Sequence, residues 1–275
     1  MQPDRTELKQ VMESAALAAG RAIMAIHRAG ADVHYKSDRS PVTAADEEAE
    51  RLILEALALH FPTIPVVAEE AVAAGSVPDI SGGTFFLVDP LDGTKEFIAG
   101  RSEFTVNIAL IRDGAPIAGI VYAPALSVGF VAEEDRAERF EVAGETEISR
   151  RQAIGCRSRG NALTAVASRS HATPETARFL DDHGIDACTA IGSSLKFCLV
   201  AEGLADVYPR FGRTMEWDTA AGDAVLRAAG GMTHTLDGSP LLYGKTNQAS
   251  DADFANPNFI AASADWRADP AANTK

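Results

Sequence analysis

The sequence predicts a mixed α/β (α+β) fold made of two halves, residues 1–155 and 156–275. Apolar residues near the N-terminus recur at helical spacing, and strand-like apolar stretches with short connections follow them. After about Arg150, strand-like and helix-like segments alternate, which is typical of a layered α/β unit. A chain of 275 residues can bury a sizeable core, either as one large domain or as two.

The first half begins with two predicted helices. From Thr6 to Arg28, apolar residues and alanines recur at helical spacing, and alanine favours the helical state. Residues 33–41 are polar and turn-like. Thr43 then precedes Asp46 by three residues, a spacing typical of a helix start, and this second helix should end before Pro62.

Predicted strands make up the rest of the first half. A short strand over residues 64–68 ends at Glu69-Glu70, and the apolar run 85–88 predicts a buried strand. Turn residues separate further strand-like segments, which are 104–111, 116–122 and 128–132. Because their connections are short, these strands should pair antiparallel.

The second half alternates between strands and helices. Predicted strands cover residues 163–167, 189–191, 207–208 and 259–262. Predicted helices cover residues 174–182, 193–202 and 219–229, and Gly230-Gly231 should stop the last of them. Such alternation predicts helices packed on a sheet in layers.

Charge and cysteine content limit the classes of function. The chain has 25 basic and 39 acidic residues, a net charge of −14, which argues against a general nucleic-acid or anionic-membrane surface. Three cysteines without CxxC spacing suggest neither a disulfide framework nor a zinc ribbon. With no signal-type segment and no stretch of transmembrane length, we expect a cytoplasmic protein.

The segment after the 85–88 run carries the main indication of function. Pro90 favours an extended Asp89, so a carboxylate should stand at the end of the strand. Asp92-Gly93 predicts a turn, and Thr94 is placed to cap a short helix. Carboxylates bind hard cations whereas a helix start binds anions, so a phosphate bridged to Mg²⁺ would satisfy both. An ordinary acidic turn is the alternative, because Asp, Pro and Gly are common turn residues.

Other acidic residues, distant from Asp89 in the sequence, stand next to the ends of predicted strands and helices. Glu69-Glu70 follows one predicted strand, and Asp218 precedes the alanine-rich helix at 219–229. Strands of one sheet can bring such ends side by side. Each acid also has a simpler explanation, a solvated strand end for Glu69-Glu70 and a helix N-cap for Asp218.

Three of these segments, taken together and in this order, resemble the inositol monophosphatase superfamily of Mg²⁺-dependent, lithium-sensitive phosphatases. They are Glu69-Glu70, Asp89-Pro-Leu-Asp-Gly-Thr94 and Trp217-Asp-Thr-Ala-Ala-Gly222, and the resemblance extends from Lys36 to Phe259. It implies a layered αβαβα sandwich with the active site between the two halves. It is also consistent with a homodimer and with peripheral attachment to the cytoplasmic face of the inner membrane.

The resemblance also assigns roles to individual residues. Thr94 and Glu69 would orient and deprotonate the attacking water, Asp46 would hold the threonine hydroxyl, and Glu70 would assist from further out. The ligands of two or more Mg²⁺ ions would be Glu69, Asp89, the Leu91 carbonyl, Asp92 and Asp218. The residues expected to contact substrate are Lys36, Gly93, Thr94, Ser193, Ser194, Lys196, Arg210 and Asp218.

One branch of the superfamily fits in more detail. Lys95-Glu96-Phe97, Glu216 and Asn256-Pro-Asn-Phe259 resemble the 3′(2′),5′-bisphosphate nucleotidases of the CysQ type, which remove the 3′-phosphate from adenosine 3′,5′-bisphosphate. The resemblance therefore implies a small anionic nucleotide as substrate, with 3′-phosphoadenylyl sulfate as a second candidate. Arg210, which follows Tyr208-Pro209, suits a second phosphate because a guanidinium can bind it bidentately.

Two alternatives stay open at this point. An inositol or other sugar monophosphate phosphatase would share every metal ligand, so the acids do not separate it from a bisphosphate nucleotidase. A non-catalytic nucleotide- or metal-binding regulator could use the same scaffold. Thr94 and Asp46 argue against a regulator, because binding alone requires no residue that activates water.

Overall fold

The structure is a computed structural model of the 275-residue chain. The residues that it describes are 4–30, 33–35, 41–158, 160, 162–169, 173–263 and 265–266. Lys36, one of the residues expected to contact substrate, lies outside the described residues.

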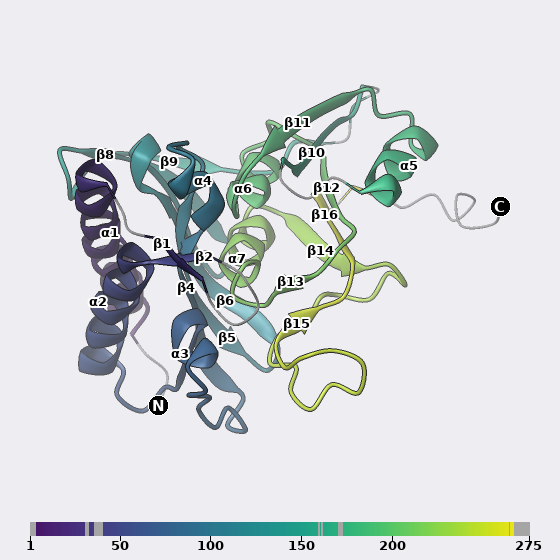
Figure 1. The fold of residues 1–275 in the computed structure, drawn as a ribbon. Coiled ribbons are helices and arrows are strands. Elements are labelled where there is room, and N and C mark those ends of the chain that lie inside the picture. The colour runs from purple at the N-terminus through teal and green to yellow at the C-terminus, as the bar shows by residue number, and fades with distance from the viewer. Residues whose placement is uncertain are drawn as a thin grey trace.

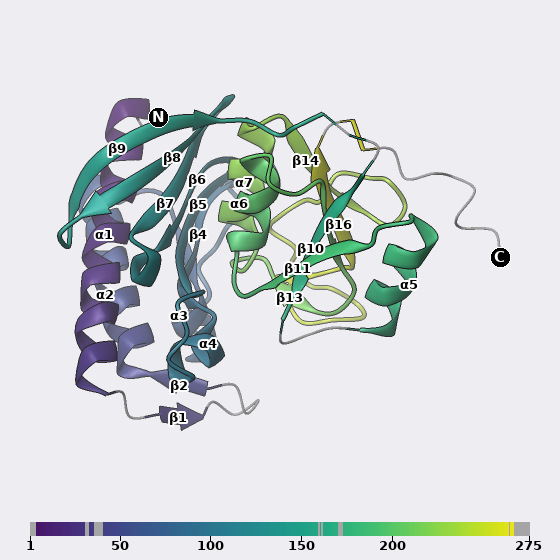
Figure 2. The same ribbon diagram turned by 90° about the horizontal axis from the view of Figure 1, so that it is seen from above.

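The described residues form the layers of an αβαβα sandwich (Figures 1 and 2). Helices α1 and α2 cover one face of a seven-stranded sheet with the order β3-β4-β5-β6-β7-β8-β9, which we call the large sheet. Helices α6 and α7 separate it from a five-stranded sheet with the order β11-β10-β12-β16-β14, the small sheet, and α5 lies on the outer side. The predicted fold class is therefore confirmed.

The elements of the first half are α1 (Arg5–Ala29), β1 (Val33–Tyr35), β2 (Pro41–Thr43), α2 (Ala44–His60), β3 (Val66–Ala68), α3 (Glu69–Ala73), β4 (Thr84–Asp92), α4 (Thr94–Ile98), β5 (Thr105–Arg112), β6 (Ala115–Ala123), η1 (Pro124–Leu126), β7 (Val128–Glu133), β8 (Arg136–Ala143) and β9 (Glu147–Ile154). The elements that follow are β10 (Thr164–Ser168), α5 (Pro174–Asp182), β11 (Ala187–Ile191), α6 (Leu195–Ala201), β12 (Val207–Arg210), β13 (Thr214–Met215), α7 (Ala220–Ala228), β14 (Gly231–Thr235), β15 (Ala255–Asn256) and β16 (Phe259–Ser263). The large sheet ends at Ile154, next to the expected boundary after residue 155, and the division into two domains stays a prediction.

Helices α1 and α2 pack against the large sheet through one continuous apolar core. α1 starts after Asp4, whose side chain accepts a hydrogen bond from the Glu7 N–H at 3.1 Å. α2 starts in a capping box formed by Thr43 and Asp46, as the sequence predicted. The apolar faces of both helices meet large-sheet residues such as Phe86. Across the described ranges, no helix combines the length and the apolar character needed to cross a membrane.

Helix α7 lies between the two sheets and contacts both of them. It approaches β6 closely, since a Cβ added to Gly119 would lie 2.7 Å from the Ala224 Cβ and 2.8 Å from the Ala221 carbonyl oxygen. Small residues on both sides are required for this approach, because any larger side chain would overlap its neighbour. The first turn of α7 is thereby held near the end of β4, where acidic residues stand.

The edge of the large sheet brings two acidic segments together. β3 pairs parallel with β4, with Ala68 opposite Val88, so both chains leave the paired region at the same edge. Glu69 and Asp89 are the next residues of their chains. The pairing of β4 with β5 shifts register between Asp89 and Asp92, an irregularity of the kind that proteins use to aim side chains beside active sites.

Several elements differ from the sequence prediction. Residues 33–41 were expected to be turn-like, but 33–35 and 41–43 pair as the antiparallel strands β1 and β2. Glu69-Glu70 begins helix α3 instead of ending a strand. Strands β8, β9, β13, β14 and β15 were not predicted. β8 and β9 carry many charged residues, which weaken the alternation of apolar and polar residues that predicts a strand. β9 is an edge strand, where charged side chains hinder pairing with the strands of other molecules.

Candidate functional site

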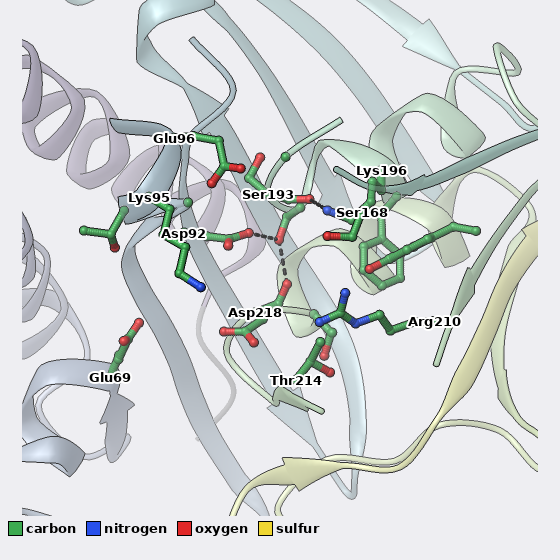
Figure 3. Close-up of a pocket in the computed structure, with 17 residues that line it drawn as sticks. Glu69, Asp92, Lys95, Glu96, Ser168, Ser193, Lys196, Arg210, Thr214 and Asp218 are labelled. Atoms are coloured by element: carbon green, nitrogen blue, oxygen red, sulfur yellow. Dashed lines mark hydrogen bonds between the residues drawn. The ribbon is translucent and has the colours of Figure 1, made fainter. Parts of the chain in front are cut away.

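A cavity of about 210 Å³ opens between the edge of the large sheet and the C-terminal half (Figure 3). The lining residues from the first half are Glu69, Asp92, Gly93, Thr94, Lys95 and Glu96, and those from the second half are Ser168, Gly192, Ser193, Ser194, Lys196, Phe197, Tyr208, Arg210, Thr214, Asp218 and Thr219. Figure 3 shows Glu69 on one side, Arg210 and Lys196 on the opposite side, and Asp92 and Asp218 between them. The cavity therefore combines groups that bind cations with groups that bind anions.

The acidic turn after the apolar part of β4 forms the floor of this cavity. Asp89 is only 1% exposed, and its Oδ1 accepts a hydrogen bond from the Leu91 N–H at 3.0 Å, which fixes the turn. Gly93 has a φ of 96°, a left-handed conformation that side chains rarely adopt, so glycine is required here. Gly93 is also the N-cap of α4, so the prediction that Thr94 caps this helix was wrong.

Thr94 instead turns its hydroxyl towards α2. Its Oγ1 lies 3.2 Å from Asp46 Oδ1 and 3.2 Å from the Leu91 carbonyl oxygen. The hydroxyl has one proton, and donation to the carboxylate is favoured because a charged acceptor makes the stronger hydrogen bond. Asp46 is held in place because its other oxygen, Oδ2, accepts from both the N–H and the hydroxyl of Thr43 at 2.8 Å.

Helix α3 carries Glu69 into the cavity. The residue before it, Ala68, has no side-chain acceptor for the free N–H groups of the first turn. The buried carboxylate of Glu50 on α2 fills this role, accepting from the Glu70 N–H at 2.8 Å and from the Ala71 N–H at 2.9 Å. Glu70 itself does not line the cavity but a separate hollow beside Glu50 and Arg51.

Asp218 precedes α7 without acting as its N-cap, which is Thr219. Its Oδ2 accepts a hydrogen bond from the Met215 N–H at 2.8 Å, so the side chain turns back along its own loop. Burial, the largest cause, and repulsion from Asp92 and Glu69 together raise the pKa of Asp218 to about 8. The simple explanation of Asp218 as a helix cap is therefore wrong.

The acids influence one another strongly. Burial raises the pKa of Asp89 well above its usual range, and the charges of Glu69, Asp92, Asp218 and Asp46 raise it further. Burial also raises the pKa of Asp92, although Lys196 and the Ser194 hydroxyl oppose this rise. Carboxylates that resist ionisation together are stabilised when a cation comes between them.

This donor set fits hard divalent cations such as Mg²⁺, which prefer carboxylate and carbonyl oxygens. As the side chains stand, however, no group of three or more His, Cys, Asp and Glu residues in the described part of the chain is arranged to hold a metal ion. Free carboxylates at about 4 Å repel by roughly 1 kcal/mol in water, which favours such a spread arrangement. Figure 3 shows the spread, because Glu69 lies across the opening from Asp92, with the side chain of Lys95 pointing into the space between them.

Ser194 ties the two halves of the site together. Its Oγ lies 3.1 Å from Asp92 Oδ2 and 2.6 Å from the Asp218 carbonyl oxygen, and it accepts from Asn107 Nδ2 at 3.0 Å. The side chain of Ser194 does not cap α6, which follows it. The serine therefore positions the acids, whereas the sequence had left a helix cap and a substrate contact open.

The opposite wall carries two buried cations. Lys196 donates to the Ser193 carbonyl and lies 5.3 Å from the centre of the Tyr208 ring. Burial lowers the pKa of Lys196 to about 8, against the opposing effect of Asp92. Arg210 donates to the Arg213 carbonyl at 3.1 Å, while its Nε has no hydrogen-bond partner among the described residues. A buried guanidinium N–H without a partner is available to a ligand.

Most of the predicted site residues come together around this cavity. Those that line it are Glu69, Asp92, Gly93, Thr94, Ser193, Ser194, Lys196, Arg210 and Asp218. Asp46, Asp89 and Leu91 lie buried directly behind it. Glu70 lines the separate hollow beside Glu50 and Arg51.

Sequence reasoning missed Glu50, Asn107 and Lys95 as site residues. For Glu50 and Asn107 the sequence did contain a signal, because each is a polar residue on an otherwise apolar face of a helix or strand. A polar residue buried in this way needs a hydrogen-bond partner. Glu50 follows Asp46 by one helical turn, and Asn107 interrupts the apolar strand β5. The signal for Lys95 was its place in the Lys95-Glu96-Phe97 motif of the CysQ-type resemblance, since a lysine beside a turn is usually solvated and its position alone indicates no role.

A comparison with known proteins shows the family of this chain. The model of the inositol monophosphatase family matches residues 4–269. The chain belongs to this family. The 3′(2′),5′-bisphosphate nucleotidase CysQ of Salmonella typhimurium is 47% identical over 243 residues, which cover 88% of this chain and 94% of that protein.

Two solved structures share the fold. CysQ from Bacteroides thetaiotaomicron, described as a bacterial member of the inositol monophosphatase family, has a TM-score of 0.76 and 36% identity, covering 94% of this chain and 98% of that one. The extragenic suppressor protein SuhB from Bartonella henselae has a TM-score of 0.71 and 27% identity, covering 94% of each chain. The resemblance found in the three acidic segments is therefore confirmed over nearly the whole chain.

Proposed function

We propose that this chain is a 3′(2′),5′-bisphosphate nucleotidase, a Mg²⁺-dependent phosphatase that converts adenosine 3′,5′-bisphosphate to AMP and phosphate. The observation that carries the proposal is a single cavity with carboxylates on one side and the buried Arg210 and Lys196 on the other. A bisphosphate needs both, because one phosphate reacts at the acids while the other binds the cations. The names of the CysQ relatives support the same activity. 3′-Phosphoadenylyl sulfate, which also carries a second anionic group, is a further candidate substrate.

The residues that would hold two Mg²⁺ ions are Glu69, Asp89, the carbonyl of Leu91, Asp92 and Asp218. When bound, such a metal pair neutralises charge on the phosphoryl group and lowers the pKa of a water molecule. Donation of the Thr94 hydroxyl to Asp46 leaves the Leu91 carbonyl available as a ligand, since both acceptors lie within reach of that hydroxyl.

Thr94 orients the attacking water in this proposal. Because its hydroxyl donates to Asp46 Oδ1, its lone pairs can accept a hydrogen bond from a water in the cavity. The Glu69 carboxylate takes the proton of that water as the new oxygen–phosphorus bond forms. The bond between phosphorus and the ribose 3′ oxygen breaks in line with the attack, and this oxygen takes a proton from solvent water to become the 3′-hydroxyl of AMP. No covalent enzyme intermediate forms.

Arg210 and Lys196 recognise the second phosphate. Arg210 is 7% exposed and Lys196 6% exposed, so both charges lie where solvent screens them weakly. The free Nε of Arg210 and its neighbouring N–H groups offer the paired donors that a phosphate accepts. Substrate contacts by Gly93, Ser193 and Ser194 are part of the same proposal. A cytoplasmic location and a homodimer stay predictions.

A phosphate-release panel tests the function. The full-length protein is incubated with Mg²⁺, with and without Li⁺, on adenosine 3′,5′-bisphosphate, 3′-phosphoadenylyl sulfate and myo-inositol 1-phosphate. We expect the highest kcat/KM on adenosine 3′,5′-bisphosphate, a requirement for Mg²⁺ and inhibition by Li⁺. A higher kcat/KM on the inositol ester would replace the proposal with the sugar monophosphatase alternative. Mg²⁺ and nucleotide binding without any phosphate release would favour the regulator.

A further inference from the structure

Helix α2 carries two buried carboxylates, Asp46 and Glu50, one helical turn apart. They are 2% and 6% exposed, and side chains four residues apart lie on the same face of a helix. Each contacts a different segment of the site. Asp46 accepts from the Thr94 hydroxyl at 3.2 Å, and Glu50 accepts from the first backbone N–H groups of α3.

Glu50 holds the start of α3 by two hydrogen bonds. Its Oε2 lies 2.8 Å from the Glu70 nitrogen and its Oε1 lies 2.9 Å from the Ala71 nitrogen. Both bonds are charge-assisted, and two of them fix the orientation of the turn as well as its position. α3 has only five residues, too few to be stable alone, so its first turn depends on contacts such as these.

The contact matters because Glu69 is the first residue of α3. Glu69 and Thr94 stand on separate segments, α3 and α4, which follow the paired strands β3 and β4. The strand pairing sets where each segment begins, and the orientation of its first turn depends on further contacts. Both segments are hydrogen-bonded to one face of α2, through Glu50 and Asp46. α2 is capped and packed on the large sheet, so it provides a fixed spacing between the two contacts.

We propose that Glu50 is a positioning residue, which sets the location of the Glu69 carboxylate relative to the Thr94 hydroxyl. The inference rests on the proposed function for the roles of Glu69 and Thr94, but Glu50 touches neither substrate nor metal in it. Partners that orient metal ligands from behind typically change metal affinity by about 10- to 100-fold when they are removed. A purely structural buried carboxylate would change stability and leave the affinity of the folded protein for metal unchanged.

The test compares wild type with Glu50→Gln, Glu50→Asp and Glu55→Gln in the full chain. Glu50→Gln keeps volume but replaces one of the two acceptor oxygens with a donor, and Glu50→Asp keeps the charge but shortens its reach. Glu55→Gln is the matched control, since Glu55 lies on the same helix with its side chain 64% exposed. Binding of Mn²⁺ is measured from the EPR signal of the free ion, hydrogen exchange reports on the amides of residues 69–71, and kcat is measured at saturating Mg²⁺.

We expect both Glu50 variants to bind Mn²⁺ about tenfold or more weakly and to exchange the 69–71 amides faster, with kcat recovering towards wild type at saturating Mg²⁺. The control should match wild type in all three measurements. A folded Glu50→Gln or Glu50→Asp with wild-type Mn²⁺ affinity would overturn the proposal, whether or not the 69–71 amides exchange faster. Failure of the proposed function would look different, because the wild-type protein would then release no phosphate. The difference in amide exchange at residues 69–71 between wild type and the Glu50 variants would still report on the Glu50 contact.

Discussion

Replacing Arg210 by methionine should remove selectivity for a second phosphate. Methionine keeps the approximate length of the side chain, so the variant loses charge and donors more than volume. The Arg213 carbonyl loses its donor, at 3.1 Å, but belongs to an exposed residue, where water can replace the guanidinium. The main consequence should therefore fall on a ligand that uses the free Nε of Arg210.

The size of the effect follows from the number of hydrogen bonds lost. A hydrogen bond to a charged group contributes about 1.5–3 kcal/mol. One such bond from Arg210 to the second phosphate corresponds to about a 10- to 150-fold change in kcat/KM, at about 1.4 kcal/mol per tenfold. Arg210 also lowers the pKa of Asp218, so its loss should weaken turnover of every substrate by a common factor, which cancels in a ratio.

The assay uses two substrates that differ by one group, adenosine 3′,5′-bisphosphate and adenosine 3′-monophosphate. The ratio of their kcat/KM values should fall by about 10- to 150-fold in Arg210→Met. Arg213→Met is the control, because it removes the same charge from a neighbouring side chain that is 56% exposed and does not line the cavity. Equal losses on both substrates in Arg210→Met would refute the assignment of Arg210 to the second phosphate.

Three further outcomes are expected. Asp92→Asn should abolish turnover while leaving the fold intact, because it weakens cation capture without removing volume; near-wild-type phosphate release in saturating Mg²⁺ would contradict this. Ser194→Ala should lower kcat/KM by about tenfold, since the link between Asp92 and Asp218 is lost; unchanged kinetics would show that the link is dispensable. Lys196 has a pKa lowered to about 8 in the folded state, from 10.5, so between these values the unfolded chain binds the additional proton. The free energy of unfolding should therefore rise with pH across this window in wild type relative to Lys196→Met, as measured by urea denaturation, and parallel pH profiles would exclude the shift.

The acidic segments and the helix signals could be predicted from the sequence because they are local. A strand followed by Asp-Pro-Leu-Asp-Gly-Thr indicates a carboxylate at the strand end and a turn, without knowledge of any distant contact. The capping pattern of Thr43 and Asp46 likewise depends on residues within one turn of helix, and it is present in the structure. The alternation of helices and strands in the second half followed from periodicity in the same way, whereas the order of the αβαβα layers was implied by the family resemblance.

Contacts between distant segments required the folded chain. The parallel pairing of β3 with β4 brings Glu69 to the same edge as Asp89, and the close approach of α7 to β6 brings Asp218 towards them. Glu50 acts on backbone N–H groups about twenty residues later, a contact that no local pattern encodes. The raised pKa of Asp218 arises from burial together with Asp92 and Glu69, so it exists only where the tertiary packing encloses all three acids. Local sequence thus specified which chemical groups were present, and long-range packing set their distances, their burial and their charges.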